Sequence, residues 1–350
     1  MNQLIKQDIE EFVRSFELSA QLGHTIFLIT GGTGLIGSTL IHCLLALNRN
    51  IRIVAPVRCK AKAQDMYESE EHTHIHFIEC DLSSFDYSEI GEVDFIVHCA
   101  APTSSKFFVE KPVETFNTIV NCTQVLLEYV RRFPVKGFVY LSSLEVYGTI
   151  LDDLNFVTEE VQGYLDPMAT RSSYPMAKRA AENLCALYAT EYNLNIMVAR
   201  LTQTTGVNVS STDNRVITQF CRLASQGQNI ILHTQGRAAR PYCYTTDCVS
   251  AILYILLKGE KGNAYNVANA DTYISARGLA ELLRDNFNPN ISVEFRLNDN
   301  MGYAPETKLR LSTAKLQELG WSPQNDLKTI LSKLISTYHY CPKKLPHRFS

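Results

Sequence analysis

Residues 26–37 read IFLITGGTGLIG, an apolar run followed directly by glycines at positions 31, 34 and 37. The run has the length and β-branched character of a buried strand, and STLIHCLLAL at 38–47 has the length and periodicity of a helix. Glycine permits a tight turn between them and lets the backbone approach a pyrophosphate, which the N–H groups and partial positive charge of the helix N-terminus attract. The stretch therefore predicts a dinucleotide-binding loop. Its candidate cofactor-binding residues are Gly31, Thr33, Gly34, Leu35, Ile36 and Gly37.

Further short apolar runs alternate with helical stretches over the first 201 residues. The strand candidates are IRIVAPV (51–57), HIHFIEC (74–80), DFIVHCA (94–100), GFVYLSS (137–143) and NIMVARL (195–201), and the longest helical stretches are 113–132 and 175–192. Such alternation is typical of a parallel sheet with helices on both faces. We therefore predict an α/β fold with a Rossmann-type doubly wound parallel sheet. We expect it over residues 23–201, with a return segment near 241–268, after an amphipathic N-terminal helix within 1–22.

The pattern becomes less regular after residue 201. Residues 202–240 are rich in polar side chains, with a helical piece at 216–225. Beyond them, 251–258, 276–287 and 326–339 have helical spacing and 263–269 reads as a strand. We expect 202–240 and 269–340 to form a smaller C-terminal α/β substrate lobe that closes a cleft over the strand ends. The tail, 341–350, is expected to be extended surface chain.

Composition narrows the class of protein. The chain has 350 residues, 45% hydrophobic and 20% charged, with a formal net charge of −3, which excludes a disordered or collagenous chain. The charge balance supplies no overall basic field, so we expect neither nucleic acid nor a membrane as partner. The longest apolar runs, such as 251–257, are much shorter than the roughly 20 residues of a membrane helix. Ten cysteines without a C-x-x-C pair indicate reduced thiols, and we expect a cytoplasmic protein.

A tyrosine and a lysine stand four residues apart in YPMAK, which places Tyr174 and Lys178 on one face of a helix. An ammonium beside a phenol favours the phenolate, so we expect Lys178 to draw the pKa of Tyr174 from about 10 toward neutrality. Tyr174 is then a candidate general acid and base, and Lys178 can also hold a ribose hydroxyl of the cofactor. Ser143, at the end of a predicted strand, can hydrogen-bond the substrate oxygen that Tyr174 protonates or deprotonates.

Six motifs in fixed order extend this pattern. They are TGGTGLIG (30–37), CDL (80–82), HCAA (98–101), SSLEVYG (142–148), YPMAKR (174–179) and RPYCYTTDCVSAI (240–252). From about residue 25 to 283 the chain resembles the extended short-chain dehydrogenase/reductase family of nucleotide-sugar epimerases, dehydratases and decarboxylases. The resemblance implies a catalytic triad and a reaction, hydride transfer between sugar carbon 4 and the nicotinamide, with the tyrosine moving the hydroxyl proton. By position, the triad is Ser143, Tyr174 and Lys178, the adenine contacts are Asp81 and Leu82, and Ala100 and Ala101 line the cofactor.

Within that family the chain looks most like the UDP-glucuronate decarboxylases. The similar stretches are PVETFNTIVNCTQVLLE (112–128) and DNRVITQF (213–220), and Glu145 matches the glutamate of their catalytic strand. The resemblance implies a catalytic role for Glu145. It also implies substrate contacts at Thr103, Gln203, Arg215 and Arg240. The two arginines would contact the diphosphate-linked nucleotide. A guanidinium suits that role, although a surface ion pair is the alternative for each arginine.

Several positions depart from the family pattern. Leu144 stands where nucleotide-sugar dehydratases carry the aspartate that protonates the leaving hydroxyl, which disfavours a 4,6-dehydratase. Ile119 and Gln203 each replace an asparagine usual in the family. The end of the second strand, VAPVRCK, has no acid for a ribose 2′-hydroxyl, and Arg58 could instead accept the 2′-phosphate of NADP or lie over the adenine. The sequence therefore leaves NAD and NADP both open.

Two other groups of residues resemble a metal site and a base-stacking site, but we predict neither site. His72, His74 and His76 alternate but lack a suitably spaced acidic or cysteine partner, so we expect no metal. Tyr242, Tyr244 and Tyr265 are expected in the lobe core and the cleft lining rather than in base stacking with RNA.

Three functional hypotheses follow. The favoured one is an epimerase or decarboxylase of a nucleotide sugar, preferably a UDP-sugar, that recycles its hydride. The second is an NAD(P)H-dependent reductase of a nucleotide-linked 4-keto sugar, which the basic Arg58 favours. The third is a noncatalytic dinucleotide-binding sensor, which would need none of the proton chemistry at Tyr174. The resemblance further implies a homodimer formed through helices 113–132 and 175–192, and a place in polysaccharide biosynthesis.

Overall fold

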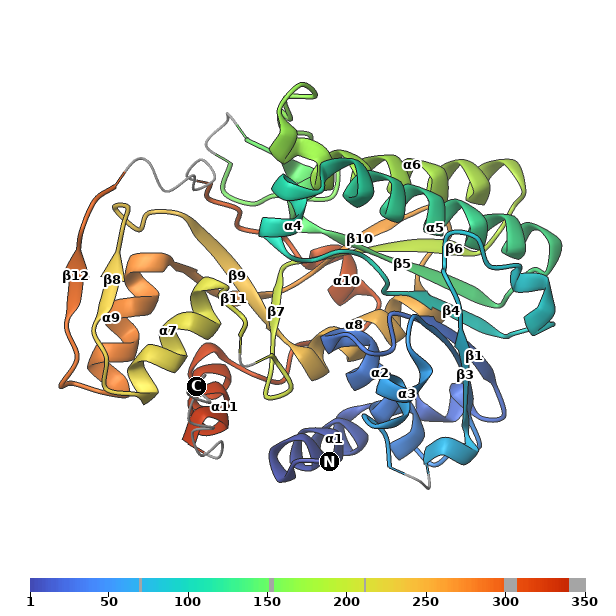
Figure 1. Cartoon of the computed structure of the whole chain (residues 1–350), viewed down its shortest axis with the longest axis horizontal. Helices are drawn as coiled ribbons and strands as arrows, with labels where there is room; N and C mark the ends of the chain where they lie inside the picture. The colour runs from blue at the N-terminus through green and yellow to red at the C-terminus, as the bar shows by residue number, and fades with distance from the viewer. Residues whose placement is uncertain (69–70, 151–153, 211, 299–306, 340–350) are drawn as a thin grey trace, which may run out of the picture.

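A seven-stranded parallel sheet forms the centre of the larger lobe in the computed structural model (Figure 1). The structure describes residues 1–350 except 69–70, 151–153, 211, 299–306 and 340–350. In sheet order the strands are β10 (Ala264–Val267), β6 (Ile196–Leu201), β5 (Gly137–Ser143), β4 (Phe95–His98), β1 (Ile26–Thr30), β2 (Arg52–Val57) and β3 (Ile75–Glu79). This order confirms the Rossmann-type doubly wound fold.

The strand order reverses at β1, which pairs with β2 on one side and with β4 on the other. At such a switch point the connecting helices leave toward opposite faces, and a crevice opens at the carboxyl ends of the strands. The strands are buried on both faces, as expected for a parallel sheet of apolar runs. The crevice between the ends of β1 and β4 is therefore the expected place for a dinucleotide.

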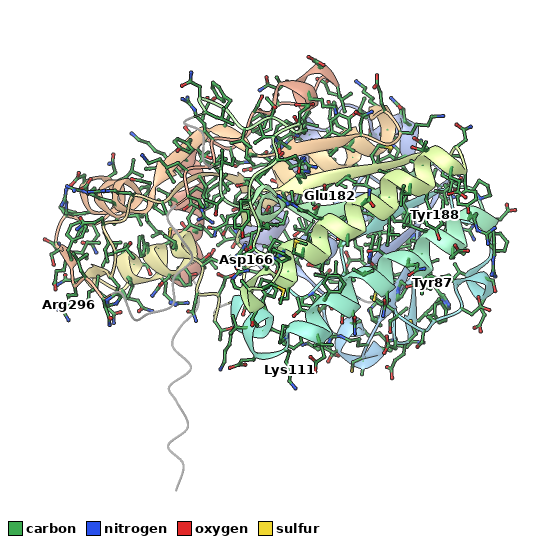
Figure 2. All side chains as sticks on the ribbon, turned by 90° about the horizontal axis from the view of Figure 1, so that it is seen from above. Tyr87, Lys111, Asp166, Glu182, Tyr188 and Arg296 are labelled. Carbon is green, nitrogen blue, oxygen red and sulfur yellow. The ribbon has the colours of Figure 1, made fainter. Side chains whose placement is uncertain are left out.

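Helices cover both faces of the sheet. On one face pack α1 (Gln3–Ser15), α2 (Leu35–Ala46) and α8 (Thr245–Lys258), and on the other α5 (Pro112–Arg132) and α6 (Ser173–Glu191). Figure 2 shows α5 and α6 lying side by side, as their extensive mutual contacts require. Short helices α3 (Lys60–Gln64), α4 (Ser105–Glu110) and α10 (Ala314–Glu318) lie beside β3, α5 and β10 respectively.

The smaller lobe has its own core and lies at the left of Figure 1. Its strands are β7 (Gln203–Thr205), β9 (Ala239–Tyr244) and β11 (Asn269–Ser275) in one sheet and β8 (Ile230–Leu232) and β12 (Val293–Phe295) in another. Its helices are α7 (Val216–Ser225), α9 (Ala276–Asn286) and α11 (Leu327–His339). A buried carboxylate, Asp8 of α1, accepts hydrogen bonds from Tyr244 of β9 (2.5 Å) and Lys333 of α11 (2.9 Å), so the N-terminal helix joins the two lobes.

The predicted strands of the larger lobe all exist, and the predicted helices are confirmed to within a few residues at their ends. The stretch predicted as a helix at 251–258 is the second half of α8, which begins six residues earlier directly after β9. The predicted tail, 341–350, lies outside the described residues. Within the described chain no helix is both long and apolar enough to cross a membrane. Nine cysteines of the described chain carry free thiols.

Candidate active site

The glycine loop forms a cradle between β1 and α2. Gly31 has a φ of +70°, and a Cβ there would lie 2.9 Å from the backbone nitrogen of Ala100. A Cβ on Gly37 would lie 2.3 Å from the Gly31 carbonyl oxygen, so strand and helix approach too closely for any side chain. The first intrahelical hydrogen bond runs from Ser38 N to the carbonyl of Gly34, which leaves the N–H groups of residues 35–37 without helical acceptors. This backbone fits the pyrophosphate of a dinucleotide.

Polar side chains fasten the strands beneath that cradle. The hydroxyl of Thr30 shares a 2.7 Å hydrogen bond with Nδ1 of His98 and accepts one from the N–H of Ala100. The other ring nitrogen of His98 lies 3.2 Å from the Thr123 hydroxyl on α5. Burial lowers the pKa of His98 to about 3, so the ring is neutral and positions β1 against β4 without adding charge. Ala101 packs beside it as part of the apolar core under α5.

The predicted triad meets at the carboxyl end of β5. The hydroxyl of Ser143 accepts a hydrogen bond from the N–H of Glu145 (3.2 Å) and is hydrogen-bonded to the Tyr174 phenol. Lys178 follows one turn later on α6, with Nζ 4.6 Å from the centroid of the Tyr140 ring and 5.9 Å from that of Tyr174. The structure thus brings the three predicted catalytic side chains together at the crevice.

The expected pKa shift of Tyr174 was wrong. Tyr174 is only 8% exposed, and burial together with the negative charge of Glu145 raises the pKa of its phenol rather than lowering it. The hydrogen bond to Ser143 and the charge of Arg171 oppose this rise in the pKa without reversing it, while the Lys178 ammonium donates to the carbonyl oxygen of Leu141 (2.6 Å). Burial also lowers the pKa of Lys178 itself to about 8, with Glu182 opposing the shift. The four-residue spacing correctly predicted that Tyr174 and Lys178 lie on one face of a helix, but it could not predict how deeply they are buried.

An ion pair not anticipated from the sequence lies beside the phenol. Nη2 of Arg171 donates to both carboxylate oxygens of Glu145, at 3.0 and 3.2 Å. The guanidinium carbon lies 5.3 Å from the centroid of Phe108, and that ring stacks on Tyr174 at 4.2 Å with an angle of 10°. Arg171 stands three residues before Tyr174, and this closeness in sequence was the signal that could have placed Arg171 in the site. Phe108 gave none, since its helix, α4, was not predicted.

The adenosine side of the crevice holds an acid that sequence reasoning overlooked. Glu79 ends β3, and its carboxylate accepts a 2.6 Å hydrogen bond from the N–H of Lys60, directly after β2. Glu79 pairs with Val57, the last residue of β2, so its carboxylate lies beside the position where NAD-binding folds place an acid. Arg58 is exposed there. The Asp81 carboxylate accepts hydrogen bonds from the N–H and hydroxyl of Ser83, which hold its pKa below its usual value.

The four candidate substrate contacts lie at both sides of the crevice. Thr103 is exposed in the loop after β4, and Gln203 begins β7, with a buried side-chain carbonyl that has no partner among the described residues. Arg215 is held by Asp213 (2.8 Å) and by the carbonyl of Thr204 (2.6 Å). Arg240 lies in β9 and has neither an ion-pair nor a hydrogen-bond partner for its side chain in the described part of the chain. Of the two arginines, Arg240 is the more available to an anion.

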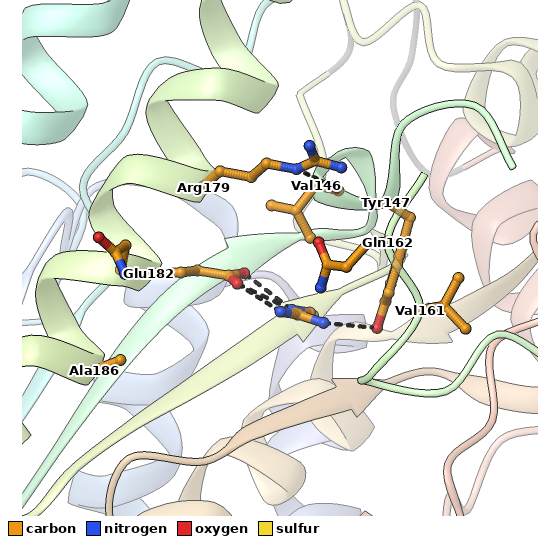
Figure 3. A pocket seen from close by; sticks show the side chains of 9 residues that line it. Val146, Tyr147, Val161, Gln162, Arg179, Glu182 and Ala186 are labelled. Carbon is orange, nitrogen blue, oxygen red and sulfur yellow. Dashed lines mark hydrogen bonds and ion pairs between the residues drawn. The ribbon is translucent and has the colours of Figure 1, made fainter. Parts of the chain in front are cut away.

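A second polar cluster joins α6 to β6 (Figure 3). Arg200 of β6 pairs with Glu182 of α6 at 2.8 Å and donates to the Tyr147 hydroxyl at 3.2 Å. Arg179 donates to the carbonyl oxygens of Val146 and Gly163. These side chains line a pocket of about 290 Å³. All three guanidinium nitrogens of Arg200 donate to protein groups, so the cluster fixes α6, the helix that carries Tyr174 and Lys178, against β6.

The other two groups weighed from the sequence show no ligand chemistry. His72 lies in a 3₁₀ turn with a ring nitrogen 3.1 Å from the Gln64 carbonyl, and of the three histidines only His76 lies in β3. No three side chains of the His, Cys, Asp and Glu types gather as a metal site in the described chain. Tyr242, Tyr244 and Tyr265 are buried in the cores.

A match to a family model accompanies this geometry. Residues 27–268 match the NAD dependent epimerase/dehydratase family. Among curated proteins, the chain is 30% identical over 302 residues to UDP-glucuronic acid decarboxylase 6 of Arabidopsis thaliana, covering 86% of this chain and 85% of that protein. It is 26% identical over 351 residues to UDP-glucuronic acid decarboxylase 1 of Xenopus tropicalis, covering 98% and 80%.

Solved structures of low sequence identity share the fold. The UDP-glucose 4-epimerase of Thermotoga maritima superposes with a TM-score of 0.76 at 21% identity, covering 90% of this chain and 98% of that one. The UDP-glucuronic acid 4-epimerase of Bacillus cereus, solved with UDP-glucuronic acid and NAD, also gives 0.76 at 20% identity, covering 90% and 99%.

Proposed function

The chain belongs to the NAD dependent epimerase/dehydratase family, and on that premise we propose that it alters a nucleotide-linked sugar through oxidation at carbon 4 and return of the hydride. One observation carries the proposal: Ser143, Tyr174 and Lys178 meet at the carboxyl end of β5, beside the glycine cradle of a dinucleotide. Of the two cofactors that the sequence left open, the family uses NAD. The carboxylate of Glu79, at the end of β3 beside the end of β2, would favour a ribose 2′-hydroxyl there over a 2′-phosphate.

The residues divide the chemistry between them. Bound NAD supplies the acceptor for the hydride of carbon 4. Tyr174 accepts the proton of the carbon-4 hydroxyl and later returns it, and Ser143 hydrogen-bonds the same oxygen. Lys178 stabilises the charged phenolate and holds a ribose hydroxyl. The resulting ketone makes loss of a neighbouring carboxylate as carbon dioxide easy, and return of hydride to its other face inverts carbon 4.

Burial of the lysine suits epimerisation better than net reduction. Lys178 is 3% exposed, and its ammonium is bonded to a backbone carbonyl rather than to a polar chain that leads to solvent. A net reductase draws one proton from solvent in every turnover. An epimerase moves the same proton out and back, so a buried triad suits it, whereas a decarboxylase also takes up one proton at the carbon that loses carbon dioxide.

UDP-glucuronate is the substrate we propose to test first, because the curated relatives are named as UDP-glucuronic acid decarboxylases. The freshly purified protein is denatured, and the released nucleotide is identified by mass spectrometry. Near-stoichiometric NAD is expected. The product is then distinguished as a UDP-pentose, from decarboxylation, or as the carbon-4 epimer. A protein that instead consumes NADPH with a 4-keto sugar would be a reductase.

Tyr174→Phe tests the catalytic assignment directly. The variant keeps the ring that stacks on Phe108 and removes only the hydroxyl. Turnover is expected to fall by about 10²- to 10⁴-fold, the usual contribution of a general acid and base, with NAD still bound. Full activity in Tyr174→Phe would contradict the role of the phenol.

A homodimer and a cytoplasmic location complete the proposal. Val113 and Phe116 of α5 and Leu187 of α6 expose apolar side chains on the two neighbouring helices that cover one face of the sheet. Pairing of these faces between two copies would bury them in a four-helix interface. The free thiols agree with a reducing compartment.

A further inference from the structure

Arg171 carries a partly unused guanidinium beside the catalytic phenol. Only Nη2 is engaged, with both oxygens of Glu145, while Nε and Nη1 have no acceptor among the described residues. The Arg171 side chain as a whole is 38% exposed. An arginine with free donors next to a reacting group is suited to bind a carboxylate or a phosphate.

The position of Arg171 is fixed before any ligand arrives. Its ion pair with Glu145 holds one end of the guanidinium, and the face of Phe108 supports the plane at 5.3 Å. Phe108 is 2% exposed and stacks on Tyr174, so the guanidinium and the phenol are held by the same ring. Preorganisation of this kind reduces the ordering cost of binding.

We infer that Arg171 determines substrate specificity by binding an anionic substituent, a carboxylate, on the sugar ring whose hydroxyl faces Tyr174. The inference rests on the proposed function and adds to it the residue that selects an acidic sugar. A carboxylate entering beside Glu145 would be repelled without a cation, and Arg171 is the cation that already neutralises this glutamate. The diphosphate of the same substrate has the same charge chemistry, but Arg240, with its unengaged guanidinium, serves it from the smaller lobe.

The test measures binding to the NAD-loaded protein, with Tyr174→Phe present throughout to prevent turnover. Dissociation constants are measured for UDP-glucuronate, UDP-glucose and UDP. Arg171→Gln is expected to weaken UDP-glucuronate by about tenfold to a hundredfold, the value of hydrogen bonds to a charged group, and the other two ligands by less than about threefold. Arg171→Lys, which keeps the charge, should restore part of the preference for the uronate.

Arg277 provides a matched control. It also pairs with a glutamate, Glu281 (2.8 Å), and lies over a phenylalanine ring, Phe295 (5.4 Å), but on α9 in the smaller lobe. Arg277→Gln should leave all three dissociation constants unchanged. Equal weakening of UDP and UDP-glucuronate by Arg171→Gln would assign the residue to the diphosphate and overturn the inference. An unchanged preference, or binding of UDP-glucose but not of UDP-glucuronate, would overturn it while the proposed function stands, and a holoenzyme that binds none of the three ligands would overturn both.

Discussion

Replacement of Gly37 by alanine is expected to damage the cofactor cradle in a measurable way. The added Cβ would lie 2.3 Å from the Gly31 oxygen, 2.8 Å from the Gly31 carbonyl carbon and 3.1 Å from the Cα of Gly32. All three are backbone atoms, so no side-chain rotation relieves the overlap, whereas non-bonded carbons prefer about 3.5–4.0 Å. Overpacking of this size costs about 1–3 kcal/mol, and the better helix propensity of alanine offsets up to about 1 kcal/mol. We expect a net loss of about 1–2 kcal/mol in the free energy of unfolding.

The same displacement separates the N-terminus of α2 from the loop, so NAD binding should weaken by at least about tenfold, or about 1.4 kcal/mol. Urea unfolding of the NAD-free protein measures the first effect, and titration with NAD measures the second. Gly278→Ala is the matched control, because Gly278 is also the third residue of its helix, α9, but a Cβ there would meet only side-chain atoms, of Ile274 at 3.1 Å and of Ser275 at 3.2 Å. It should leave NAD binding unchanged. Wild-type stability and NAD affinity in Gly37→Ala would refute the steric argument.

Three further predictions concern charge and packing. Burial lowers the pKa of Lys178 to about 8, so the ammonium is lost as pH rises through that value. The value of kcat/KM should then fall by about tenfold per pH unit above it. A flat pH profile up to the pKa of a free lysine would contradict this role. Leu187→Asp puts a charge on the exposed face of α6 and should convert a dimer to a monomer in analytical ultracentrifugation, while an unchanged sedimentation coefficient would exclude this face. Asp8→Ala removes the acceptor of the Tyr244 hydroxyl and should lower the free energy of unfolding by about 1.5–3 kcal/mol in urea titration, with no change expected if the contact is not formed in solution.

The fold could be predicted because its signals are local. A glycine triplet between an apolar run and a helical stretch, followed by further buried strands, defines the switch point between β1 and β4 without knowledge of any distant contact. Tyr174 and Lys178 were found for the same reason, since four residues on one helix fix their relative position. The short strands β7, β8, β9, β11 and β12 were missed or only partly anticipated, because three to seven residues of mixed polarity carry little periodic signal.

The environment of the site depends on contacts between distant segments, and the sequence could not supply it. Arg171 meets a glutamate 26 residues earlier and a ring from α4, an element with no clear pattern. Glu79 lies beside the end of β2 only because β3 is the adjacent strand, a fact that belongs to the sheet order. Residue types were therefore predictable, whereas pairing, burial and the direction of the pKa shifts were not.

The raised pKa of Tyr174 has a consequence for how the phenolate forms. In the ligand-free protein, burial and Glu145 favour the neutral phenol, and the nearest ammonium is bonded to the Leu141 carbonyl. The phenolate of Tyr174 must therefore depend on charges that act once ligands fill the cleft. Lys178 would then leave the Leu141 carbonyl and hydrogen-bond a ribose hydroxyl and the phenol. Difference spectra between the wild type and Tyr174→Phe isolate this one phenol from the other tyrosines. In the NAD-free protein it should ionise above its usual pKa, and in the complex with NAD and UDP it should ionise at lower pH. Ionisation near neutrality without ligands would show that Lys178 alone activates the phenol and that burial does not control it.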